Sequence, residues 1–99
     1  MSEKIEIKLD QDSQKGEFSL FVNDKPAGEM TFIYKEKNVI DVDHTGVNPE
    51  LKGLGLGKHL MEELIKFAKE NDLKVIPSCP YVKIMIERNI DYQQVLYSK

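Results

Sequence analysis

The chain has 99 residues, a net charge of −3 and 40% hydrophobic residues. This length supports a single domain spanning residues 1–99 and excludes a two-domain enzyme. The one cysteine, Cys79, excludes an internal disulfide, and a chain that is not basic predicts no nucleic-acid partner. The chain opens with charged residues rather than a signal peptide, and no apolar run reaches the ~20 residues that span a bilayer. We therefore expect a cytoplasmic protein without a membrane partner.

The first half of the chain has the alternating pattern of β-strands. Apolar residues alternate with polar ones in segments 5–9, 18–22, 27–34 and 39–47. The connections between these segments are short, which predicts an antiparallel meander. In the last segment, alternation places His44 on the face of Ile40 and Val42, and Thr45 on the opposite face.

The second half changes to helical periodicity. Leu60, Met61, Leu64, Ile65 and Ala68 form one apolar stripe, which predicts a helix over residues 55–71. A short strand is expected over 73–76 and a second helix over 81–87. Pro80 suits the first turn of that helix, and Ser78 or Cys79 its N-cap. One or two further turns are expected in the tail, Asp91 to Lys99, and the fold class is α+β.

The segment between the last strand of the meander and the long helix is rich in glycine. Gly53, Gly55 and Gly57 alternate with leucines, and Lys58 follows. Unpaired amides at a helix N-terminus, approached through glycines, form a phosphate site. The spacing fits neither a Walker loop nor the dinucleotide fingerprint G-x-G-x-x-G. The alternative is a helix start with flexible glycines and no ligand.

This segment resembles motif A of the GNAT acetyltransferase superfamily. Val47, Pro49 and the three glycines occupy the matching places, and Lys52 stands where the superfamily usually has Gln or Arg. The segments Asp43-His44-Thr45 and Ile76 to Val82, with Arg88-Asn89 downstream, are similar to a subgroup of small single-domain GNAT-like proteins. The resemblance covers about residues 17–92 and implies a minimal GNAT-like fold: an antiparallel meander followed by helix, strand and helix.

The resemblance also implies acetyl-coenzyme A (acetyl-CoA) as the cofactor. The backbone of Thr45 and Val47 is expected to pair with the pantetheine arm. The pyrophosphate cradle is expected to be formed by the backbone amides of Gly53, Leu54, Gly55, Leu56, Gly57 and Lys58, and Lys52 and Lys58 are expected to add positive charge.

The length of the chain bears on the acceptor. GNAT domains of ordinary size carry two helices between their first two strands, and the segment Asp10 to Gly16 is too short for them. The acceptor side should therefore be open, and an open site discriminates small molecules poorly. We expect N-acetyl transfer to an amine on a protein or peptide, such as a lysine or the N-terminus.

Three side chains are candidates for catalysis. A histidine can take the proton of an attacking amine, so His44 is either the general base or an inert core histidine. A thiol at a helix N-terminus is activated, so Cys79 is a nucleophile that carries acetyl, a residue lining the pocket, or an inert buried cysteine. The resemblance favours a site position for Cys79 and gives Tyr81 the role of proton donor to the departing thiolate; the alternative for Tyr81 is packing. No metal site is expected.

Two other functions fit the same features. One is a module that binds coenzyme A without catalysis. The other is a thiol or acyl sensor that depends on Cys79.

Overall fold

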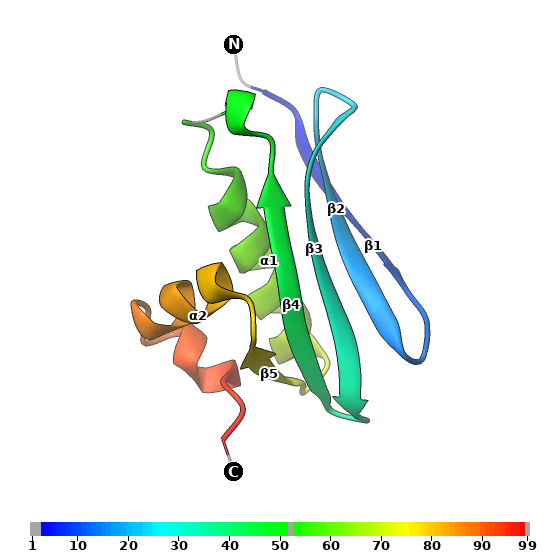
Figure 1. Ribbon diagram of the computed structural model, residues 1–99, viewed down its shortest axis with the longest axis vertical. Helices are drawn as coiled ribbons and strands as arrows, with labels where there is room; N and C mark the ends of the chain where they lie inside the picture. The colour runs from blue at the N-terminus through cyan, green and yellow to red at the C-terminus, as the bar shows by residue number, and fades with distance from the viewer. Residues whose placement is uncertain (1–2, 52, 99) are drawn as a thin grey trace.

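The computed structural model describes residues 3–51 and 53–98 and confirms the α+β fold (Figure 1). Four strands form the antiparallel meander: β1 (Ile5–Gln11), β2 (Lys15–Val22), β3 (Lys25–Glu36) and β4 (Val39–Val47). The remaining elements are the 3-10 turn η1 (Pro49–Leu51), helix α1 (Leu56–Glu70), strand β5 (Lys74–Pro77), helix α2 (Pro80–Glu87) and the 3-10 turn η2 (Tyr92–Val95). The strand order in the sheet is β1-β2-β3-β4-β5, and β5 pairs with β4 in parallel.

The described helices lie on one side of the sheet, as Figure 1 shows. The predicted stripe of α1 is buried, with Leu60, Met61 and Leu64 at 0% exposure. Its Phe67 ring packs edge-on against Phe18 of β2, with centroids 5.5 Å apart. The turn between β1 and β2 spans only residues 12–14, which leaves no room for helices on the other side. The outer face of the meander is therefore open, as the length of this segment predicts.

A β-bulge near the end of β4 changes which side chains face the helices. Thr31 pairs with His44 while the next residue, Phe32, pairs with Val42, so Asp43 is an extra residue in β4. One extra residue inverts the alternation beyond it. His44 therefore lies on the outer face with 58% of its side chain exposed, and Thr45 turns toward Cys79. The prediction that His44 shares a face with Ile40 and Val42 is wrong, and the core-histidine interpretation is excluded with it.

Strands β4 and β5 separate after a short pairing. The parallel register ends at Val42 and Pro77, where proline removes a backbone donor. One more contact follows, from the Cys79 amide to the Val42 carbonyl at 2.9 Å. Among the described residues, no strand pairs with β4 on that side beyond this point. Residues 43–47 therefore form a backbone edge that no described strand covers, and Cys79 lies beside it at Thr45. In the chain, η1 lies between this edge and the glycine segment.

Candidate active site

The glycine segment bends in the left-handed region before α1 begins. Gly53 has φ +92° and Gly55, the N-cap of α1, has φ +67°, which an L side chain adopts only with strain. A Cβ added to either glycine would meet no atom within 4 Å. Leu56 is buried and anchors the segment, whereas Lys58 is exposed at the first turn of the helix. The amides at the start of α1 are thus open to a ligand.

Lys52, which was predicted to add a positive charge to this cradle, lies outside the described residues.

Gly57 differs from the other two glycines because a side chain lies over it. A Cβ at this position would collide with the hydroxyl and ring of Tyr81. The Tyr81 hydroxyl is therefore held against the first turn of α1. Burial raises the pKa of Tyr81, and the negative charges of ionised Tyr92 and Cys79 would raise it further. Tyr81 is a protonated phenol next to the glycine segment and can donate that proton.

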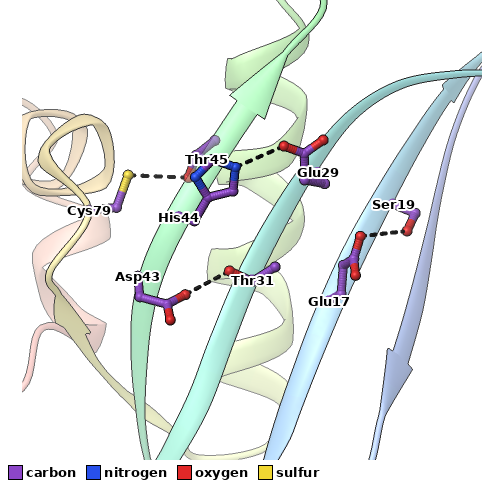
Figure 2. A network of polar contacts seen from close by, with 8 residues as sticks. All are labelled: Glu17, Ser19, Glu29, Thr31, Asp43, His44, Thr45 and Cys79. Carbon is purple, nitrogen blue, oxygen red and sulfur yellow. Dashed lines mark hydrogen bonds and ion pairs between the residues drawn. The ribbon is translucent and has the colours of Figure 1, made fainter.

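Cys79 occupies the N-cap of α2 and is only 5% exposed. Its Sγ lies 3.5 Å from the Oγ1 of Thr45 (Figure 2). Burial alone would raise the pKa of Cys79. The Thr45 hydroxyl and the backbone N–H groups of Val82, Tyr81 and Thr45 outweigh that effect, and the pKa is lowered. The structure thus places Cys79 beside the free edge of β4 in a setting that favours the thiolate.

His44 is on the same strand as Thr45 but on the other face. Its Nε2 lies 2.9 Å from the Oε2 of Glu29 on β3 (Figure 2). Cys79 instead contacts Thr45, the next residue of β4, whose side chain points to the opposite side of the sheet. The structure therefore brings Cys79, Tyr81 and Thr45 together but does not form a Cys79–His44 pair.

Glu29 is the polar residue of this region that the sequence did not reveal. It is 15 residues from His44, and its contact depends on the β3–β4 register and on the bulge. The pattern Glu-Met-Thr of a half-buried strand gives no signal for such a pair.

Two kinds of feature are absent from the part of the chain that the structure describes. Residues 3–51 and 53–98 contain no group of three or more His, Cys, Asp or Glu side chains that could hold a metal ion. No helix within these ranges is long and apolar enough to cross a membrane.

Parallel strands that separate beside a glycine-rich helix N-terminus give the chain the fold of an acetyltransferase domain. Residues 17–95 match the family model of the GCN5-related N-acetyltransferases. The chain belongs to this family.

Individual relatives agree with this assignment. Protein NATD1 of Mus musculus is 30% identical over 84 residues, which covers 84% of this chain and 76% of the relative. The solution structure of a GCN5-like protein from Staphylococcus aureus is 35% identical, with a TM-score of 0.69 over 93% of this chain and 89% of that chain. A GNAT family acetyltransferase from Elizabethkingia anophelis, solved with acetyl-CoA bound, has a TM-score of 0.65 at 11% identity and covers 85% of this chain and 72% of that chain. At that identity the similarity shows the fold alone.

Proposed function

We propose that this chain binds acetyl-CoA along the free edge of β4 and transfers its acetyl group to an amine. The acceptor is a lysine side chain or an N-terminus on a protein or peptide. The observation that carries the proposal is an edge of β4 that no described strand covers, together with the open glycine segment that follows η1. Cys79 lies beside this edge, and Tyr81 lies over Gly57.

The described residues fit this cofactor. The backbone of Thr45 and Val47 would hold an extended arm in the manner of an added strand. The free amides of Gly53–Lys58, with the positive end of the α1 dipole and the charge of Lys58, would hold phosphate groups. Family membership supports the choice of ligand.

When bound, acetyl-CoA supplies an acetyl group activated as a thioester. An amine attacks only in its neutral form, and a lysine with a pKa of ~10.4 is almost entirely protonated at pH 7. His44, exposed on the outer face, accepts the proton of the incoming amine. Tyr81, a phenol whose pKa burial raises further above its ordinary value, donates a proton to the departing sulfur. Cys79 lines the site, and its lowered pKa favours the thiolate. This thiolate either polarises the site or carries the acetyl group for a short time as a thioester on its sulfur.

The open outer face supports a macromolecular acceptor. The turn at residues 12–14 cannot enclose a small substrate, and His44 lies on the uncovered side of the sheet. An amine that protrudes from a protein or peptide surface can reach such a face without entering a closed pocket.

A second function is favoured by one observation. His44 and Cys79 lie on opposite sides of β4, so the proposed base and the thiol do not work as a pair. That arrangement also fits a coenzyme A-binding module without turnover, or a sensor in which Cys79 is oxidised or acylated.

A turnover assay separates the two functions. The protein is incubated with acetyl-CoA and a panel of peptides that present a lysine or a free N-terminus, and acetylation is followed by mass spectrometry. The proposal expects turnover on at least one peptide class, with the mass of one acetyl group added at the amine. Micromolar binding of coenzyme A without acetylation of any peptide would favour the binding module. If Cys79→Ser still binds coenzyme A but has lost the response of the wild type to oxidation, the sensor function is identified.

A further inference from the structure

Glu29 and His44 form a pair across neighbouring strands of the open face. The Glu29 Oε2 lies 2.9 Å from the His44 Nε2, and both side chains are partly exposed. A carboxylate can only accept a hydrogen bond, so neutral His44 must carry its proton on Nε2 to make this contact. The lone pair of the ring is then on Nδ1, the nitrogen that Glu29 does not cover (Figure 2).

Gly46 provides the space in which the Glu29 carboxylate lies. Gly46 is the register partner of Glu29 on β4. A Cβ at this position would collide with the Glu29 Oε2 and would lie 3.3 Å from the His44 Nε2. The collision involves the far end of a flexible side chain, so an alanine would displace the carboxylate rather than the strand. The absence of a side chain at Gly46 is therefore what lets Glu29 reach the imidazole.

The other carboxylates near this part of the face have different partners. Asp43 accepts a hydrogen bond from the Thr31 hydroxyl at 2.6 Å. Glu17 on β2 lies 3.5 Å from the Ser19 hydroxyl (Figure 2). Of these three carboxylates, only that of Glu29 contacts the His44 ring.

We propose that Glu29 is the positioning residue of His44, in a Glu29–His44 dyad that Gly46 makes possible. The inference rests on the proposed acetyl transfer. Nδ1 takes one proton from the attacking amine and the ring becomes an imidazolium. The Nε2 proton stays on Nε2, where the Glu29 carboxylate balances the new positive charge. The proton on Nδ1 then leaves to solvent.

The test uses Glu29→Ala and Gly46→Ala, with Glu17→Gln as the matched control on the same face. Nitrogen chemical shifts of the His44 ring report the tautomer without any need for turnover. Steady-state kinetics report kcat and KM.

In both test variants, we expect the Nε2–H fraction to fall toward that of a histidine in an unstructured peptide. We expect kcat to fall about two- to fivefold, as for the loss of one exposed ion pair, with an unchanged KM for acetyl-CoA. Glu17→Gln should match the wild type in both readouts.

The outcomes separate this inference from the function on which it rests. A wild-type tautomer in both test variants, or equal effects in Glu17→Gln, would overturn the dyad. A shifted tautomer with unchanged kcat would overturn its role in positioning. Absence of turnover in the wild type would overturn the proposed function and the catalytic role together, while the tautomer would still decide whether the pair exists.

Discussion

Substitution of Gly55 separates the two properties that the glycine segment contributes, backbone conformation and access for a ligand. Gly55 has φ +67° and ψ 34°, and an added Cβ would meet no atom within 4 Å. The cost of Gly55→Ala is therefore conformational rather than steric. The left-handed region costs ~1–2 kcal/mol for an L residue, and the loss of unfolded-state freedom returns ~0.4–1 kcal/mol. We expect a net loss of about 1 kcal/mol and a Tm about 4–8 °C lower.

Gly55→Asn is the matched variant. Asparagine adopts the left-handed region more readily than alanine and is a favoured N-cap, so it should lose less than half the stability lost in Gly55→Ala. Both variants place a Cβ where a phosphate would approach the amides. If one charge-assisted hydrogen bond is lost, affinity for coenzyme A falls about tenfold or more in each.

Urea unfolding and calorimetric titration with coenzyme A measure the two effects separately. Equal stability losses in Gly55→Ala and Gly55→Asn would refute the conformational argument. Wild-type affinity in both variants would refute the assignment of the cradle to these amides.

Three further predictions concern the catalytic candidates. The alkylation rate of Cys79 by iodoacetamide should rise with pH around a midpoint below that of an ordinary thiol, because its pKa is lowered and the thiolate reacts. Thr45→Val should move the midpoint upward and Thr45→Ser should restore it; an unmoved midpoint in Thr45→Val would contradict the role of the hydroxyl. His44→Gln should lower kcat by ~10²–10⁴ in a peptide acetylation assay. Because the His44 side chain is 58% exposed, stability in urea should change by less than ~0.5 kcal/mol, and a stable variant with full turnover would remove His44 from the reaction. Gly57→Ala should displace Tyr81 and lower kcat as much as Tyr81→Phe, and the double variant should lose no more than either; additive losses would show that the two residues act separately.

The order of the elements could be predicted from the sequence because each period is strong and local. The strand over residues 39–47 is confirmed at both ends, and the helix predicted over 55–71 is observed as Leu56–Glu70. Short connections and a change of period at the glycine segment are sufficient to order these elements. The placement of Cys79 at the N-cap of α2 also depends only on local features, the Pro80 that follows it above all.

The orientation of the site residues could not be predicted in the same way. The bulge at Asp43 is set by the pairing of β4 with β3, and one extra residue moves His44 from the helix side to the open face. The contact of Glu29 with His44 follows from the same register and from the missing side chain at Gly46. Tyr81 reaches Gly57 only because β5 ends at Pro77 and α2 begins at Pro80, with Tyr81 in its first turn. Each of these features depends on pairing between segments that are distant in sequence.

Titration of the nitrogen-15-labelled protein with acetyl-CoA, followed through backbone amide shifts, tests the central claim most directly. The proposed function predicts the largest saturable changes at the free edge of β4, residues 45–47, and at Gly53–Lys58. Amides at these positions that stay unchanged at ligand saturation, or changes confined to the outer face of β1 and β2, would contradict the assignment of this site to acetyl-CoA.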